Sequence, residues 1–233
     1  GHGDTTGYTN RYSPTLTASL GPGRTAISLS VNAYETCVIL DNGSTSCWGL
    51  RLNSMGNSVS YNVPTHRNLI PTGHTAAYSE RDFDNDGVLN IFDTHQSLDH
   101  YETSIASGYF HTCALINDGN ISCWGRNAEG QLGNGGTTDS SLPTSVNFQY
   151  LSGRKAVAIT AGGFHTCALL DDGNISCWGK ASEGQLGTGG TIQQNSPVLT
   201  ASLGIGRTAV SVSAGGSHTC AVLDNGSISC WGR

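Results

Sequence analysis

One phrase occurs four times in this chain of 233 residues: a cysteine, nine residues, and then Cys-Trp-Gly. The four phrases use all eight cysteines and all four tryptophans. The cysteine pairs are Cys37/Cys47, Cys113/Cys123, Cys167/Cys177 and Cys220/Cys230. A short unit that recurs in this way indicates an array of similar structural units. Cysteines paired at constant spacing persist mainly in oxidising surroundings, so the pattern predicts an extracellular or cell-surface protein.

The composition favours short strands joined by tight turns. Hydrophobic residues make up 36% of the chain and charged residues 12%, while 32 residues are glycine. This profile suits an all-β domain better than a helical one. The net charge of −6 offers no basic surface for nucleic acid or for an anionic membrane. No run of 18 apolar residues occurs, so the sequence predicts no membrane insertion.

Each repeat unit contains the pattern of a β-hairpin. In three units an apolar strand begins at Gly-x-x-His-Thr-Cys, and the chain returns as Ile-Ser-Cys-Trp-Gly after a three-residue turn. Glycine at the third position of the turn supplies the left-handed residue of a three-residue hairpin loop. The four turns are Asp41–Gly43, Asn117–Gly119, Asp171–Gly173 and Asp224–Gly226.

The hairpin pattern places the two cysteines of each unit opposite each other. Cys37 faces Cys47 because Leu40 and Ser44 flank the turn symmetrically. Opposed residues at a non-hydrogen-bonded position bring their Cβ atoms close enough for a disulfide. We therefore predict four cross-strand disulfides, each worth about 2–3 kcal/mol in the chain-entropy model. A zinc site, the alternative, needs close Cys-x-x-Cys pairs, which the sequence lacks.

Alternation along a strand puts each cysteine and the tryptophan that follows it on opposite faces of the sheet. Both faces must then be buried, which happens when sheets stack face to face. The blades of a β-propeller stack in this way. The sequence therefore predicts an all-β fold of four propeller-type blades.

Three segments resemble the repeat of the regulator of chromosome condensation family: Ala161–Leu170, Cys177–Gly179 and Glu183–Gly187. The resemblance implies propeller blades of about 50 residues, usually about seven to a ring. The first unit departs most, with Glu35 in place of histidine and no Gly-Gln-Leu-Gly segment. The founding member's role in nucleotide exchange on chromatin does not follow from the fold. Other members resemble pure binding scaffolds, including a secreted β-lactamase inhibitor.

The repeats divide one propeller-repeat domain, residues 1–233, into four bodies and an insertion. The first two units are 76 residues apart, from Cys37 to Cys113, whereas the next periods are 54 and 53 residues. We place the insertion at about residues 66–100. The repeat bodies are expected at about residues 25–49, 101–125, 155–179 and 208–232.

The two ends of the sequence fit together in register. Residues 13–26 align with residues 196–209, which include the expected outer strand of a blade. If residue 1 is counted as following residue 233, Cys230 and Pro14 are 17 residues apart, which is also the spacing between Cys47 and Pro64. The chain therefore behaves as one turn of a 233-residue super-repeat. The first strand can close its own ring, complete the last blade of a neighbouring copy, or belong to a longer tandem array. We favour the fibre or array arrangements.

The insertion contains a calcium-loop pattern. Gly87 provides the sharp turn at position 6, and the last ligand is an aspartate rather than the usual glutamate. The pattern also resembles the calcium repeats of thrombospondin type 3 and dockerin modules. An acidic solvated loop, the alternative, would not keep the glycine and the ligands in register. The predicted Ca²⁺ ligands are Asp82, Asp84, Asp86, the Val88 carbonyl, Asn90 and Asp93.

The three histidines of the repeat, His111, His165 and His218, are expected to bond local backbone at turns. A shared metal site is disfavoured because they belong to three separate blades. No nucleophile with a neighbouring base stands out, so the sequence predicts no enzyme. Catalytic residues are therefore not assigned.

Each unit also carries one Asn-x-Ser sequon at its hairpin. Asparagine, glycine and serine are common turn residues, so sequons arise there by chance. Their recurrence in every unit of a secreted protein favours glycosylation of some of them. The four sites are Asn42, Asn120, Asn174 and Asn225.

Two functions are compatible with these features. The favoured one is an extracellular structural or interaction protein, a glycosylated fibre subunit that associates head to tail with copies of itself. The alternative is a secreted binding module whose blade loops recognise a protein or glycan partner.

Overall fold

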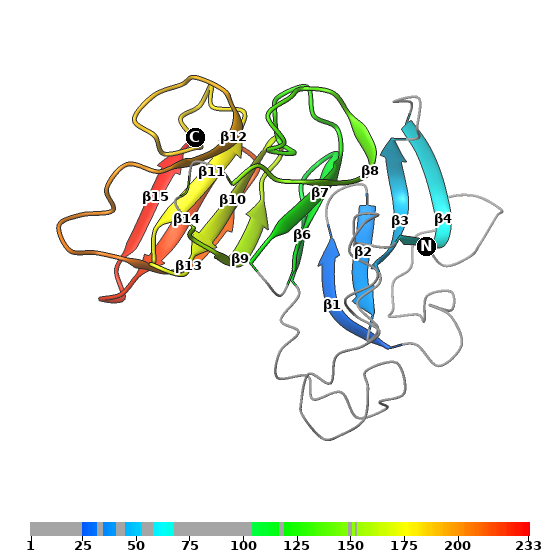
Figure 1. The fold of residues 1–233 in the computed structure, drawn as a ribbon, viewed down its shortest axis with the longest axis horizontal. Coiled ribbons are helices and arrows are strands. Elements are labelled where there is room, and N and C mark those ends of the chain that lie inside the picture. Colours follow the sequence, from blue (N-terminus) through cyan, green and yellow to red (C-terminus); the bar gives the residue numbers. More distant parts are fainter. Residues whose placement is uncertain are drawn as a thin grey trace.

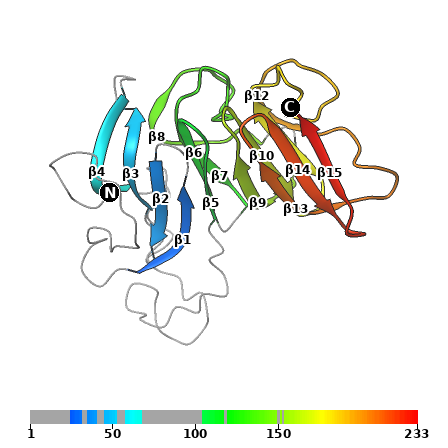
Figure 2. The same cartoon turned by 180° about the vertical axis from the view of Figure 1, so that it is seen from behind.

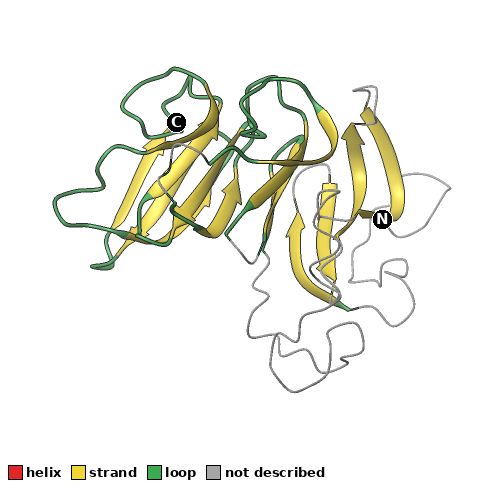
Figure 3. Cartoon of the chain, in the orientation of Figure 1, coloured by secondary structure: helices red, strands yellow, loops and turns green. Residues whose placement is uncertain are grey.

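A computed structural model describes residues 25–31, 35–40, 45–52, 58–67, 104–116, 119–148, 151 and 153–233. All regular structure in these residues is β, arranged in four antiparallel sheets, as Figures 1 and 3 show. Each sheet is one repeat unit, which confirms the predicted all-β blade architecture. Residues 68–100 of the predicted insertion, which include its calcium loop, lie outside the described residues, and its first two residues belong to a strand.

Among the described residues, three blades have four strands and the fourth has three. The first blade consists of β1 (Ala26–Val31), β2 (Glu35–Leu40), β3 (Thr45–Leu52) and β4 (Ser58–Arg67). The second consists of β5 (Ile105–Ser107), β6 (His111–Leu115), β7 (Ile121–Gly125) and β8 (Ser140–Ser145). The third consists of β9 (Ala156–Ala161), β10 (His165–Leu170), β11 (Ile175–Gly179) and β12 (Gln194–Leu199). The fourth consists of β13 (Ala209–Ala214), β14 (His218–Leu223) and β15 (Ile228–Gly232).

The predicted hairpin turns Asp171–Gly173 and Asp224–Gly226 are present, while Asp41–Gly43 and most of Asn117–Gly119 lie outside the described residues. In the third blade the amide of Leu170 donates to the carbonyl of Asn174 over 2.9 Å, which closes a three-residue loop. Gly173 occupies the left-handed region with a φ of 76°. A side chain there would be strained, which explains the glycine at this position of the repeat.

The blades stand side by side in chain order, and Figures 1 and 2 place the first and the fourth at opposite ends. The first strands of neighbouring blades contact one another, so these strands line the inside of the arc. We call the side of a blade that faces its predecessor the leading face. The side that faces its successor is the trailing face.

The core of the protein lies between blades. The Cys113–Cys123 disulfide of the second blade packs in one cluster with Trp178 of the third. The Cys167–Cys177 disulfide packs in the same way with Trp231 of the fourth blade. Cysteines therefore lie on trailing faces and tryptophans on leading faces, as the alternation predicts.

Candidate interaction interface

All four predicted disulfides are formed. In each blade the two cysteines are direct partners in the register of the second and third strands. Their Cα atoms are 4.1–4.2 Å apart, the close approach typical of a non-hydrogen-bonded pair. Each disulfide therefore lies on one face of its sheet, and in the first three blades the tryptophan of the next blade packs in the same cluster.

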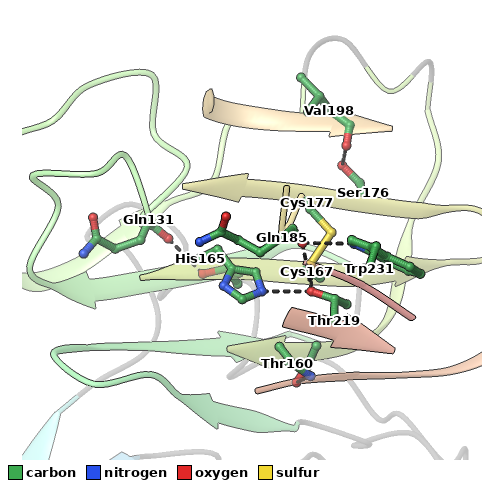
Figure 4. The surroundings of a disulfide bond; sticks show 12 residues. Gln131, Thr160, His165, Cys167, Ser176, Cys177, Gln185, Val198, Thr219 and Trp231 are labelled. Atoms are coloured by element: carbon green, nitrogen blue, oxygen red, sulfur yellow. Dashed lines mark hydrogen bonds between the residues drawn. A yellow bond between two sulfur atoms is a disulfide. The ribbon is translucent and has the colours of Figure 1, made fainter. Parts of the chain in front are cut away.

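A chain of hydrogen bonds joins the third blade to the fourth, as Figure 4 shows. Nε2 of His165 lies 2.9 Å from Oγ1 of Thr219 in the fourth blade. The Thr219 hydroxyl donates to the carbonyl of Gln185, in the loop that follows β11, over 2.9 Å. Nε1 of Trp231 donates to the same carbonyl, also over 2.9 Å. We call this set of four residues the blade joint.

The second and third blades are connected by an identical blade joint. Its bonds run from His111 to Thr166 (2.8 Å), from Thr166 to the Gln131 carbonyl (2.9 Å), and from Trp178 to that carbonyl (2.9 Å). A carbonyl oxygen has two lone pairs, so each glutamine accepts both bonds without competition. The recurring His-Thr, Cys-Trp and Gly-Gln-Leu-Gly motifs thus act together as one connection.

The blade joint fixes the state of each buried histidine. Thr166 has a single hydroxyl hydrogen, and the Gln131 carbonyl takes it. Nε2 of His111 must therefore carry the hydrogen of the remaining bond, which makes Nδ1 the unprotonated nitrogen. Nδ1 of His111 and of His165 is buried without a hydrogen-bond partner among the described residues. Both imidazoles are neutral donors.

Burial lowers the pKa of both histidines. Desolvation, with a smaller contribution from His165, lowers the pKa of His111 from 6.5 to about 3. Desolvation, with a smaller contribution from His218, lowers the pKa of His165 to about 4. Neutral imidazole is therefore favoured in the folded chain at every pH above about 4.

The expectation that these histidines bond local backbone was wrong for the side chains of His111 and His165. Each ring reaches across to a threonine of the next blade, because the glycine three residues earlier leaves room for it. A Cβ atom at Gly162 would collide with the ring of His165. The spacing Gly-x-x-His is therefore required by the packing of the ring.

The joint between the first and second blades keeps the packing but has fewer of these bonds. Cys37, Cys47 and Trp124 share a buried cluster, and Sγ of Cys37 lies 4.0 Å from Oγ1 of Thr112. Nε1 of Trp124 has no partner among the described residues, since the first unit lacks the Gly-Gln-Leu-Gly segment. This interface therefore forms without the histidine and carbonyl bonds of the complete joint, although the amide of Ser107 still donates to Oγ1 of Ser30 across it over 2.9 Å.

The trailing face of the fourth blade is uncovered among the described residues. Ile175 of the third blade is 1% exposed, whereas its counterpart Ile228 is 70% exposed. Along β14, residues on the leading face are buried while His218 and Val222, on the trailing face, are exposed. The fourth blade thus presents the donor half of a blade joint with no blade against it.

The leading face of the first blade is open along β1. Leu29 is 62% exposed, although its counterparts Ile159 and Val212 pack into the clusters between blades. Val31, on the same side of β1, is also 62% exposed. Trp48, Val38 and Leu40 of this blade are already buried together, so the open part lies along β1.

A cluster of aromatic rings and cations lies at the turns that lead into β6 and β10. The ring of Tyr109 meets that of Phe164 edge to face, with centroids 5.7 Å apart. Cζ of Arg126 and Nζ of Lys180 lie 5.6 and 5.7 Å from the centre of the Phe164 ring. Tyr109 is 41% exposed, so this aromatic and cationic cluster faces solvent.

Two models of the regulator of chromosome condensation (RCC1) repeat match the sequence. One matches residues 118–169 and 172–222, and the other matches residues 103–131 and 156–185. The chain is an RCC1-repeat protein. The matched residues extend from the second blade into the fourth, and these are the blades that the complete joints connect.

Curated relatives share these RCC1 repeats. The ultraviolet-B receptor UVR8 of Arabidopsis thaliana is 35% identical over 103 residues, which cover 44% of this chain and 23% of the receptor. The mitochondrial RCC1 domain-containing protein RUG3 of the same plant is 33% identical over 130 residues, covering 56% of this chain and 28% of RUG3. The human E3 ubiquitin-protein ligase HERC2 is 37% identical over 123 residues, covering 52% of this chain and 2% of the ligase. The matches span less than a third of each relative's length.

Solved structures support the RCC1 fold. Yeast RCC1 (Prp20) bound to Kap60 superposes with a TM-score of 0.61 at 19% identity, over 91% of this chain and 42% of that one. Human WBSCR16 also gives 0.61, at 21% identity over 85% of this chain and 44% of that one. At these identities the likeness shows the fold alone. No described segment forms a helix of the length and apolarity needed to cross a membrane.

Of the remaining predicted sites, the structure describes three, and all three are glycosylation sequons. Asn120, Asn174 and Asn225 are exposed at hairpin turns, and Asn42 lies outside the described residues. The predicted calcium ligands Asp82 to Asp93 also lie outside them. Within the described ranges, no group of three or more acidic, histidine or cysteine side chains is arranged to hold a metal ion.

Proposed function

We propose that the chain is an extracellular structural protein that associates head to tail with copies of itself. The uncovered trailing face of the fourth blade carries this proposal. An apolar sheet face beside a sheet edge that has no pair among the described residues is a surface that favours association. The contact joins two different surfaces, so repeating it gives a chain of copies rather than a symmetric dimer.

The extracellular part of the proposal rests on the four disulfides, which are rare in reducing compartments. Glycans at Asn42, Asn120, Asn174 and Asn225 fit that location, and mass spectrometry of the secreted chain would detect them.

A Ca²⁺ ion held by the insertion would order residues 66–100. If the ion binds there, millimolar Ca²⁺ protects this segment from a protease, and no protection would contradict the site.

Electron microscopy of the purified chain tests the proposed association. We expect linear assemblies whose number and length grow with protein concentration, since each added copy exposes a new fourth blade. Sedimentation velocity on the same samples measures the distribution of lengths. Discrete particles of one chain at all concentrations would contradict the proposal.

A binding module for a protein or glycan partner is the second candidate. The exposed cluster of Tyr109 and Phe164 with Arg126 and Lys180 favours it, because aromatic edges and cations are common in recognition surfaces. One solved relative, yeast RCC1, was crystallised bound to Kap60. Both candidates are non-enzymatic functions, and the match to the ligase HERC2, which covers 2% of that protein, carries no ligase activity over to this chain.

A further inference from the structure

We infer that the cluster of Tyr109, Phe164, Arg126 and Lys180 binds an extended acidic segment of a partner protein, whose carboxylates contact the two cations. This inference rests on the binding module, the second candidate function, and names the chemistry of its partner. The surface is formed by the turns that lead into β6 and β10 and by the residues that follow β7 and β11.

The two cations occupy equivalent positions in neighbouring blades. Arg126 follows the glycine that ends β7, and Lys180 follows the glycine that ends β11. The amide of Arg126 donates to the carbonyl of Phe110 over 2.8 Å, and the amide of Lys180 donates to the carbonyl of Phe164 over 2.9 Å. Each cation is therefore held beside the turn that leads into the second strand of its own blade. Because the strands are antiparallel, these turns lie at the opposite end of the sheet from the hairpin turns.

Backbone hydrogen bonds align these turns from blade to blade. The amide of Tyr109 donates to the carbonyl of Gly163 over 3.2 Å, and the amide of Gly163 donates to the carbonyl of Gly216 over 3.1 Å. A Cβ atom at Gly163 would lie 3.1 Å from Cε2 of Tyr109, and one at Gly216 would lie 2.7 Å from the Tyr109 hydroxyl. The ring of Tyr109 thus extends over the turns of the next two blades. The surface is built on backbone that neighbouring blades fix, which lowers the ordering cost of binding.

The arginines at the hairpin end of the blades are neutralised within the chain. Arg154 forms a salt bridge with Asp172, and Nη1 of Arg207 lies 3.3 Å from Oδ1 of Asp224. Both carboxylates belong to the hairpin turns predicted from the sequence. A carboxylate of a partner would gain little at these arginines.

The two cations of the cluster have no carboxylate partner among the described residues. Neither Arg126 nor Lys180 forms an ion pair there, although Glu129 and Glu183 follow them in the same loops. Both cations lie over the one ring of Phe164, which attracts them but does not neutralise their charge. An anion at this point relieves the repulsion between them. Since the whole chain has a net charge of −6, the attraction for an acidic segment is confined to this patch.

An extended peptide fits the cluster better than a glycan does. The ring of Phe164 already meets Tyr109 and lies under both cations, so it is not available for stacking on a sugar. Acidic side chains at alternate positions of an extended segment point to the same side, about 7 Å apart. One of them can accept two parallel hydrogen bonds from Arg126, and the next can contact Lys180. The Tyr109 hydroxyl, which has no hydrogen bond with any described residue, can donate to a further carboxylate oxygen.

Fluorescence anisotropy with the whole disulfide-bonded chain and a labelled peptide of alternating aspartate and glycine tests this site. We expect binding that weakens as NaCl is added, because salt screens exposed charges. Arg126→Gln and Lys180→Gln should each weaken binding about tenfold. The same substitution at the hairpin end, Arg154→Gln or Arg207→Gln, is the matched control and should leave binding unchanged. A peptide with asparagine in place of aspartate should not bind.

The outcomes separate the inference from the binding-module candidate. Absence of peptide binding, equal binding of the asparagine peptide, or binding that survives substitution of either cluster cation overturns the inference. An oligomer of uronic acid is titrated in parallel. If that glycan binds through Lys180 and the peptide does not, the binding module stands and only its acidic-peptide partner is wrong. If neither binds, the cluster loses its role in recognition as well. Thermal unfolding of each variant, unchanged from the parent, shows that the blades are intact.

Discussion

Replacing the third disulfide by the pair Cys167→Ala and Cys177→Ala is expected to lower the free energy of unfolding by at least about 3 kcal/mol. Closing a loop with a sequence separation of 10 residues gives about 3 kcal/mol in the chain-entropy model. Both cysteines are buried against the fourth blade, so their truncation also removes packing of about 1 kcal/mol or more. Urea denaturation with a common m-value measures the loss.

The fourth disulfide provides a matched control for this change. Cys220 and Cys230 have the same sequence separation of 10, but no blade covers them among the described residues. Cys220→Ala with Cys230→Ala should therefore lose the loop contribution and little packing. Equal losses at both sites would contradict the role of the buried disulfide as a platform for the next blade.

Lowering the pH from 7 to 5 is expected to destabilise the fold by about 2 kcal/mol for each of His111 and His165. The folded chain holds their pKa values at about 3 and about 4, below the value of 6.5 for an exposed histidine. The unfolded chain therefore binds more protons below pH 6.5. The stabilisation is complete above pH 6.5 and declines continuously as the pH falls toward 4.

The double variant His111→Asn with His165→Asn isolates this effect. An asparagine amide can still donate a hydrogen bond but does not titrate, so the loss between pH 7 and 5 should shrink by most of the histidine contribution. Urea denaturation at both pH values gives the two differences. An equally steep decline in the variant would assign the acid sensitivity to other groups.

The local sequence pattern was enough to predict the hairpins, the cysteine pairs, and the opposite faces on which the cysteines and tryptophans are buried. Period-two alternation and the glycine of each turn fix the register, and the register pairs Cys167 with Cys177. The same alternation puts Trp178 on the opposite face. Both conclusions hold in the structure because they depend on contacts within about ten residues of sequence.

The blade joint was missed because it connects residues far apart in sequence. His165 and Thr219 are separated by 54 residues, and no local rule pairs them. A signal was available in the first unit, where Glu35 replaces the histidine and the Gly-Gln-Leu-Gly segment is also absent. Motifs that disappear together indicate parts of one contact. The cations after Trp-Gly, Arg126 and Lys180, were overlooked for the same reason.

A double-mutant cycle between His165 and Thr219 tests most directly whether the blade joint couples neighbouring blades. The free energy of unfolding is measured by urea denaturation for the parent chain, for His165→Ala, for Thr219→Val, and for both changes together. A shared hydrogen bond predicts that each change lowers this free energy by about 1 kcal/mol and that the double change is little worse than either. Fully additive effects, or none, would contradict the account.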